Sequence, residues 1–186
     1  MQLFMIWLGL IFAYSIQFLA ESRRHRSNYY LLVSRGAREI HSRLMQIYYL
    51  LPWLTFFLAA GEYFIKYRLP LSFSLVSYEP QFFLPLSFIM ILFGALLRIW
   101  VIHSLGWLWT RRLLACRGFV KTKLGPYRWL SHPEYIARLA EGCGFCLLLG
   151  SQFSTVFYLI STIGLYIRII PKEASHLAYY QDEQTV

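Results

Sequence analysis

The sequence is short of charge, and of negative charge above all. Charged residues make up 15% of its 186 residues and hydrophobic residues 58%, whereas a soluble domain averages roughly 25% charged residues. This composition excludes an ordinary soluble domain and is typical of a membrane protein. Acidic residues number nine against 18 Lys and Arg, which gives a formal net charge of +9.

Cysteine is also scarce, and the three present predict no disulfide framework. Cys143 and Cys146 have a C-x-x-C spacing, which in other settings indicates redox or metal chemistry. Here the spacing lies in an apolar segment and includes Gly142 and Gly144. We therefore favour small residues that allow close contact between membrane helices, and we predict no metal site.

Long apolar runs predict an all-α, polytopic integral membrane protein with about five transmembrane helices. A helix needs about 20 apolar residues to cross the hydrocarbon core. The run that begins the sequence lacks a basic stretch before it, so we expect a first transmembrane helix and not a signal peptide. The fourth run is short and carries Arg138 and Glu141 near its start, so we expect it to form a tight C-terminal helical hairpin with the fifth. The runs are residues 3–20, 44–65, 82–102, 136–150 and 153–170.

We expect one domain over residues 1–186, with an N-terminal two-helix region at 1–81 and a core region at 82–186. Basic residues concentrate in segments 21–43 and 103–138. Five crossings place both segments and the C-terminal tail on one side of the membrane, which the positive-inside rule makes cytoplasmic. Anionic lipid head groups explain this basic excess more simply than a nucleic acid, which we exclude as a partner.

One polar and aromatic stretch, residues 125–135, interrupts the apolar runs and is the candidate for chemistry. Its Gly-Pro pair predicts a turn. His132 followed by Pro133 predicts a helix start, because Pro at the first helical position loses no hydrogen bond. Glu134 then lies in the first turn, where the helix dipole favours an anion. We expect His132 and Tyr135 to project toward a common space.

Three of the charged residues within the apolar runs are candidates for a role in the site or for pairing. Arg98 is expensive in a membrane unless it reaches the surface or pairs, and we favour the first explanation, snorkelling to the cytoplasmic surface. Arg168 is a functional-site candidate whose partner we expect to be Glu173 or Glu141. Glu141 shares a helix face with Glu134 and Arg138, which fits an ion-pair ladder and a general base equally well.

The chain resembles the isoprenylcysteine carboxyl methyltransferase family over about residues 90–177, most closely its small bacterial members, some of which are associated with polyketide synthases. The shared pattern is Gly-Pro-Tyr, then His-Pro-x-Tyr, a helical hairpin, and an Arg followed by a Glu. The residues that carry it are Gly125, Pro126, Tyr127, His132, Pro133, Tyr135, Arg168, Glu173 and Leu177.

The resemblance implies a transferase that binds S-adenosylmethionine from the cytosol and a lipophilic acceptor from the bilayer, in a bacterial inner membrane. It implies that Tyr127, His132, Pro133, Glu134, Tyr135 and Glu173 line the cofactor pocket. Arg168 would face the acceptor, with Glu173 and Glu141 as further catalytic candidates. An acceptor carboxylate needs only Arg168 to hold it, whereas a phenol or enol needs a base. Neither the acceptor nor an oligomeric state is fixed by the sequence.

Two other functions remain open at this stage. A sterol-reductase-like membrane enzyme also has an Arg-His-x-x-Tyr segment and uses NADPH, but Ser131 stands here in place of the Arg. A non-catalytic membrane assembly protein is the second alternative, in which the polar residues only mark interfaces. Replacing His132 or Glu173 would then affect folding or assembly and no ligand affinity.

Overall fold

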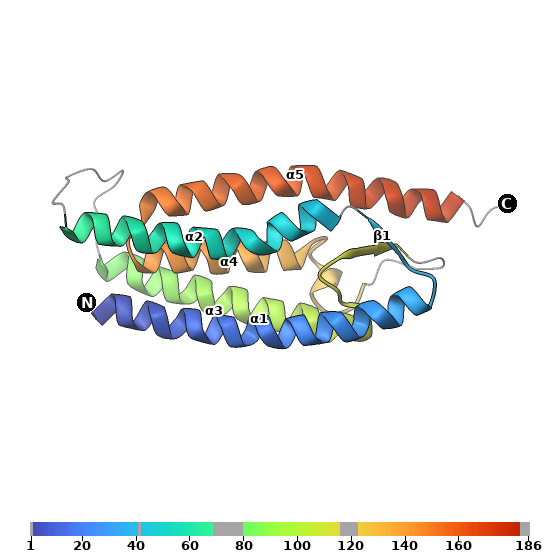
Figure 1. The fold of residues 1–186 in the computed structure, drawn as a ribbon, viewed down its shortest axis with the longest axis horizontal. Coiled ribbons are helices and arrows are strands. Elements are labelled where there is room, and N and C mark those ends of the chain that lie inside the picture. Colours follow the sequence, from blue (N-terminus) through green and yellow to red (C-terminus); the bar gives the residue numbers. More distant parts are fainter. Residues whose placement is uncertain (1, 41, 69–79, 116–122, 183–186) are drawn as a thin grey trace.

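The computed structural model describes residues 2–40, 42–68, 80–115 and 123–182. Within them, five α-helices run along one long axis (Figure 1). The helices are α1 (Gln2–Ser34), α2 (Ser42–Arg68), α3 (Pro80–Leu105), α4 (Pro133–Leu148) and α5 (Gln152–Asp182). The 3-10 helices η1 (Gly106–Leu108) and η2 (Gly125–Arg128) lie in the connection from α3 to α4.

A two-stranded antiparallel sheet is the one departure from an all-α fold in the described ranges. Strand β1 (Arg38–Ile40) pairs with β2 (Leu113–Ala115), with Glu39 opposite Leu114. It joins the α1–α2 connection to the segment after α3, at the end of the bundle that also carries η1, η2 and the start of α4 (Figure 1). We call this end the loop end. The predicted all-α membrane protein is otherwise confirmed.

Four of these helices, and not five, are long and apolar enough to cross a membrane. The candidate spans are Phe4–Ser34, Arg43–Lys66, Phe82–Leu108 and Gln152–Pro171. Helix α4 has 16 residues, about 24 Å at 1.5 Å per residue, which is less than the ~30 Å hydrocarbon core. The expected C-terminal hairpin is present, but its first helix is a short central helix.

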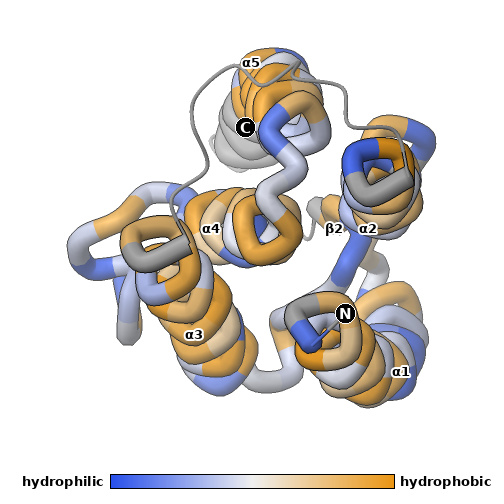
Figure 2. Tube along the Cα trace, turned by 90° about the vertical axis from the view of Figure 1, so that its left-hand side faces the viewer, coloured by the Kyte–Doolittle hydropathy of each residue, from blue (hydrophilic) through white to orange (hydrophobic). Residues whose placement is uncertain are grey.

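Helix α4 lies in the middle of the bundle, with the other four around it (Figure 2). It contacts α3 most extensively, and also α5, α2 and α1. Eleven of its 16 residues are buried. Because most of α4 is buried, its polar side chains must find partners on the neighbouring helices.

Helix α1 continues well past the predicted span, through much of the expected loop at 21–43. It runs to Ser34 and ends where Gly36 adopts a φ of 86°. The N–H of Gly36 donates to the carbonyl of Val33, and the N–H of Ala37 to that of Leu32, which is the Schellman arrangement. The added turns are charged in sequence, but Glu21 and Asn28 on one face of them are buried against the bundle.

Helix α5 continues beyond the apolar run 153–170. Its candidate span ends at Pro171, and the helix continues through this proline to Asp182. Proline in a long membrane helix removes one backbone hydrogen bond without ending the helix when neighbouring groups compensate.

Candidate functional site

The start of α4 lies at the loop end, as does the C-terminal half of α5 (Figure 1). Both polar groups identified in the sequence, His132 to Tyr135 and Arg168 to Glu173, are therefore at the same end of the bundle. Pro133 occupies the first turn of α4 and is buried. The Gly-Pro turn expected before it is the 3-10 helix η2, in which Gly125 has a φ of 56°.

An aromatic cluster surrounds the first turn of α4. The rings of His132 and Tyr135 stack with centroids 5.5 Å apart, and Tyr135 stacks on Tyr166 of α5 at 4.6 Å. Tyr48 of α2 meets Tyr135 edge to face at 5.5 Å. The Tyr166 hydroxyl donates to the backbone carbonyl of Tyr135. His132 and Tyr135 thus face a common aromatic space built from three helices.

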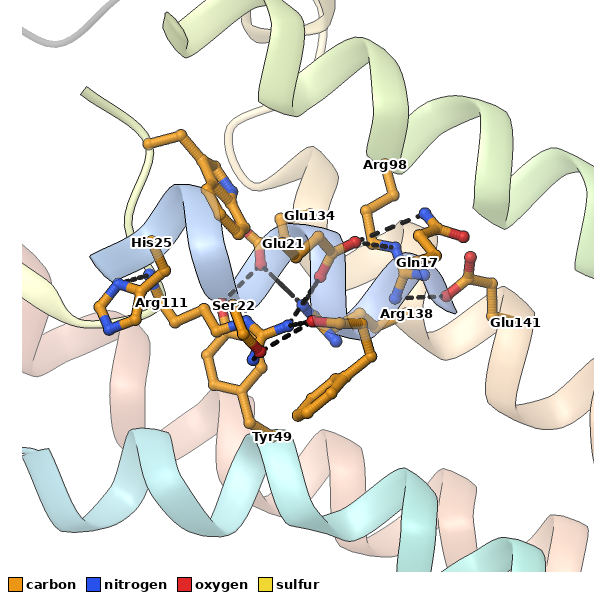
Figure 3. A network of polar contacts seen from close by, with 12 residues as sticks. Gln17, Glu21, Ser22, His25, Tyr49, Arg98, Arg111, Glu134, Arg138 and Glu141 are labelled. Carbon is orange, nitrogen blue, oxygen red and sulfur yellow. Dashed lines mark hydrogen bonds and ion pairs between the residues drawn. The ribbon is translucent and has the colours of Figure 1, made fainter. Parts of the chain in front are cut away.

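A buried network of ion pairs also involves α4 (Figure 3), and its Arg138 lies 5.6 Å from the ring centre of Tyr48 in the aromatic cluster. Glu21 of α1 is its centre, with one carboxylate oxygen 3.0 Å from Arg98 Nε. The other oxygen is 3.3 Å from Arg111 Nη2 and 3.5 Å from Arg138 Nη2. We define the buried ion network as Glu21, Arg98, Arg111, Glu134, Arg138 and Glu141.

Two more carboxylates complete the network. Glu141 lies 2.9 Å from Arg98 Nη1, and Glu134 lies 3.3 Å from Arg138 Nε. Glu134 also accepts hydrogen bonds from the Tyr49 hydroxyl at 2.8 Å and from Trp109 Nε1 at 3.2 Å. Its carboxylate is therefore held by donors from α2, α4 and the segment that follows η1.

The three arginines lie against aromatic faces as well as carboxylates. The Arg138 guanidinium is 4.2 Å from the ring centre of Tyr49, and that of Arg111 is 3.9 Å from the ring centre of Phe18. Such cation–π contacts strengthen when water is excluded. Three positive and three negative side chains balance within the network, which lowers the cost of burying each charge.

Arg111 and Arg112 begin the segment that leads into β2, outside the candidate spans. Burial lowers the pKa of Arg111, an effect that the charge of Glu21 partly offsets. A hydrogen bond to Glu39, 2.7 Å from Arg112 Nη1, raises the pKa of Arg112. Arginine keeps its charge at neutral pH in either case because its pKa starts far above 7.

The expectation that Arg98 snorkels to the surface is wrong. Its side chain is 0% exposed and lies between Glu21 and Glu141. Of the predicted ion-pair ladder, the Glu134–Arg138 contact is present, whereas Glu141 pairs with Arg98. Glu141 therefore lies inside the network. It is not part of the aromatic cluster of His132, Tyr135, Tyr48 and Tyr166 around the first turn of α4, which we call the aromatic mouth. Its role as a base stays a prediction.

The remaining predicted site residues are more dispersed. Tyr127 is half-buried and packs on a cluster of Val101, Ile102 and Trp109. Arg168 is exposed on α5. Glu173 belongs to α5, but its side chain lies outside the described part of the structure, and so does the predicted Arg168–Glu173 contact.

The packing explanation for Gly142-Cys143-Gly144 is confirmed. A Cβ atom at Gly142 would overlap the ring of Tyr158, and one at Gly144 would come 2.8 Å from Ile91 Cγ1 and 2.9 Å from the Ser87 carbonyl. Both cysteines are buried and free. In the described ranges, no three His, Cys, Asp or Glu side chains are grouped as a metal site would require.

Sequence reasoning missed Glu21 and Arg111 as members of the site. The available signal was the spacing of Glu21, His25 and Asn28, which places them on one face of a helix that continues past residue 20. Reading residues 21–43 as a loop hid that face.

Comparisons with known proteins find a family match for the second half of the chain. The model of the isoprenylcysteine carboxyl methyltransferase family matches residues 87–179, half of the chain. The chain is 37% identical over 46 residues to "Uncharacterized protein YpbQ" of Bacillus subtilis (strain 168). That similarity covers 25% of this chain and 27% of the length of YpbQ. No solved structure matches.

Proposed function

Because the chain belongs to the isoprenylcysteine carboxyl methyltransferase family, we propose that it transfers a methyl group from S-adenosylmethionine to an oxygen of a lipophilic acceptor. Membership supports a membrane methyltransferase in general, and the cofactor and the acceptor are the finer part of our proposal. One observation carries it. The matched residues 87–179 contain every predicted site residue, and α4 and α5 bring the two polar groups to one end of the bundle (Figure 1).

The aromatic mouth of α4 fits the cofactor chemically. S-adenosylmethionine supplies a methyl group on a sulfonium cation, and aromatic faces attract organic cations. Tyr135, His132 and Tyr166 form such faces. Tyr127 and Pro133 are further residues that we assign to the cofactor pocket, and Glu173 is the carboxylate that we assign to the amino or ribose groups.

Glu134 contributes to this site indirectly. Its carboxylate is occupied by Tyr49, Trp109 and Arg138, so it orients the first turn of α4 and leaves the cofactor contacts to His132 and Tyr135. Methyl transfer is an in-line displacement, and the protein mostly supplies alignment and a matched field. A first turn fixed by three donors serves that purpose.

We further propose that the loop end faces the cytoplasm, in a bacterial inner membrane. Exposed arginines at this end support this assignment, because cytoplasmic loops carry an excess of Lys and Arg. Anionic lipid head groups are the partners that we propose for them. The exposed arginines of α1, β1 and the start of α2 are Arg23, Arg24, Arg26, Arg38 and Arg43.

Cofactor binding tests the proposal. Isothermal titration of the purified protein in detergent with S-adenosylhomocysteine should show saturable binding. His132→Ala should weaken that binding because the ring stacked on Tyr135 is lost. The control is His103→Ala, which removes an exposed histidine from the last turn of α3 and should leave binding unchanged. A folded protein that does not bind S-adenosylhomocysteine would contradict the proposed function.

The acceptor class is tested by two substitutions. With a carboxylate acceptor, Arg168→Lys should remove most activity because a point charge replaces a two-pronged donor. With a phenolic acceptor, Glu141→Gln should be the damaging change. Since Glu141 also neutralises Arg98, the Tm of the Glu141→Gln protein must be measured together with its activity. Equal activity of both variants would remove both residues from the mechanism.

A further inference from the structure

One face of α1 holds the segment between η1 and β2. His25 Nδ1 accepts the backbone N–H of Arg111 at 3.2 Å, and the Asn28 side chain donates to the carbonyl of Trp109 at 2.8 Å. Arg111 in turn donates to Ser22 Oγ at 2.6 Å. Helix α1 precedes the residues that the family model matches, yet it fixes the backbone on both sides of Thr110.

The contacts around Glu21 form a closed ring (Figure 3). Glu21 binds Arg138, Arg138 binds Glu134, and Glu134 accepts from Trp109 Nε1. Trp109 is two residues before Arg111, which returns to Glu21. The ring therefore joins α1, the first turns of α4 and the segment after η1.

Glu21 provides one of two links in this ring between α4 and the segment after η1, and the Trp109–Glu134 hydrogen bond provides the other. The Arg138–Glu134 pair is local, four residues apart on α4. Its contact with Arg111 runs through Glu21, whose side chain is 4% exposed. At a site this buried, water does not replace the carboxylate if it is lost. The positive charge that is then unbalanced would displace Arg111 and Arg138.

We propose that Glu21 is a positioning residue for the cofactor site: by binding Arg138 and Arg111 together, it sets the orientation of Glu134 and of the first turn of α4. The proposal rests on the proposed function, because the site positioned is the cofactor site. This role makes α1 part of the functional unit. It requires no direct contact between Glu21 and the cofactor.

The test compares three variants of Glu21 with a matched control. Glu21→Gln leaves the network with one excess positive charge. Glu21→Asp keeps the charge but shortens the reach of the carboxylate to Arg98, Arg111 and Arg138. Glu21→Gln/Arg111→Gln restores neutrality and leaves two complete pairs, Arg98–Glu141 and Arg138–Glu134. The control, Glu62→Gln, breaks an ion pair with Lys66 at 2.9 Å far from the loop end.

Affinity for S-adenosylhomocysteine and Tm are measured on the full-length protein in detergent. We expect Glu21→Gln to lower both, with an affinity loss of about tenfold or more, the size of effect that loss of a ligand's hydrogen-bond partner has at metal sites. Glu21→Asp should keep most of the Tm and lose affinity. The double variant should regain Tm and stay weak in binding. Glu62→Gln should lower Tm and leave the affinity for S-adenosylhomocysteine unchanged.

The outcomes separate this inference from the proposed function. If the double variant regains affinity together with Tm, Glu21 only balances charge and the inference is wrong. Wild-type affinity in Glu21→Asp also overturns it, even if Glu21→Gln does not fold. If the folded wild type does not bind S-adenosylhomocysteine, the proposed function fails, and the inference fails with it.

Discussion

At the scale of single residues, the main feature is the burial of complete charges within a membrane protein. Arg98 and Arg138 have side chains 0% and 1% exposed, and Glu141 is 3% exposed. A buried charge is costly alone and tolerable when paired. Each of these arginines therefore depends on a carboxylate from another turn or another helix, and removing one partner leaves the other uncompensated.

Arg98→Met should be among the most destabilising substitutions. It leaves Glu141 without its partner at 2.9 Å and removes one contact of Glu21. Breaking a buried pair costs about 3–5 kcal/mol. The free energy of unfolding in detergent, from denaturant titration, measures the change. Arg23→Met, at an exposed position of α1, is the control and should stay within about 0.5 kcal/mol. Equal stability of both variants would contradict the assigned role of Arg98.

At the scale of elements, α4 is the helix around which the others are arranged. It is too short to span a bilayer alone and is enclosed by its neighbours (Figure 2). Close approach is possible because glycines lie at the contacts with α3 and α5, including Gly94 of α3, where a Cβ would meet the Ala137 carbonyl and Glu141. Such small residues let membrane helices pack closely without a hydrophobic driving force.

Gly142→Ala tests this packing. The added methyl group would overlap the ring of Tyr158, which is buried and donates to the Arg138 carbonyl at 3.0 Å. Overpacking of this kind costs about 1–3 kcal/mol. Gly164→Ala is the matched control on α5, where a Cβ meets no atom within 4 Å, and it should gain up to about 1 kcal/mol from helix propensity. Urea unfolding of both variants gives the comparison, and a stabilised Gly142→Ala would refute the close contact.

At the scale of the whole molecule, charge is sorted between inside and outside. The carboxylates of Glu21, Glu134 and Glu141 are committed to the buried ion network, and Glu39 pairs with Arg112. Exposed arginines at the loop end are consequently not neutralised by these acids. Helix α1 has 33 residues, about 50 Å long, so it extends beyond the ~30 Å hydrocarbon core and carries some of these arginines on its outer face.

Anionic lipid should be retained at this surface. Native mass spectrometry of wild-type protein should show bound phosphatidylglycerol in preference to phosphatidylcholine. The variant Arg23→Gln/Arg24→Gln/Arg26→Gln should lose that preference, because each cation contributes about 1 kcal/mol near an anionic surface. High salt should reduce retention, since exposed charges are screened beyond ~10 Å at 0.1 M. Equal retention of phosphatidylglycerol by the triple variant and the wild type would exclude these arginines.

Sequence alone determined the class of the protein and the position of its motif. Apolar runs predicted the helices because a transmembrane helix needs about 20 consecutive apolar residues, and such a run can be recognised from the local sequence alone. The His132-Pro133 pair predicted the start of α4 because the preference of Pro for the first turn is also local. The family resemblance rested on the same stretch together with Arg168, Glu173 and Leu177 further along the chain.

Tertiary structure decided which charges meet. Glu21 and Arg138 are 117 positions apart in the chain, and no local pattern pairs them. Arg98 looked like a surface-seeking residue because its partners come from α1 and α4. Helix α1 extends through the expected loop because one face of its last turns is buried against the segment after η1. Burial and pairing depend on how the helices pack together, so these features follow from the assembled bundle and not from any one of its segments.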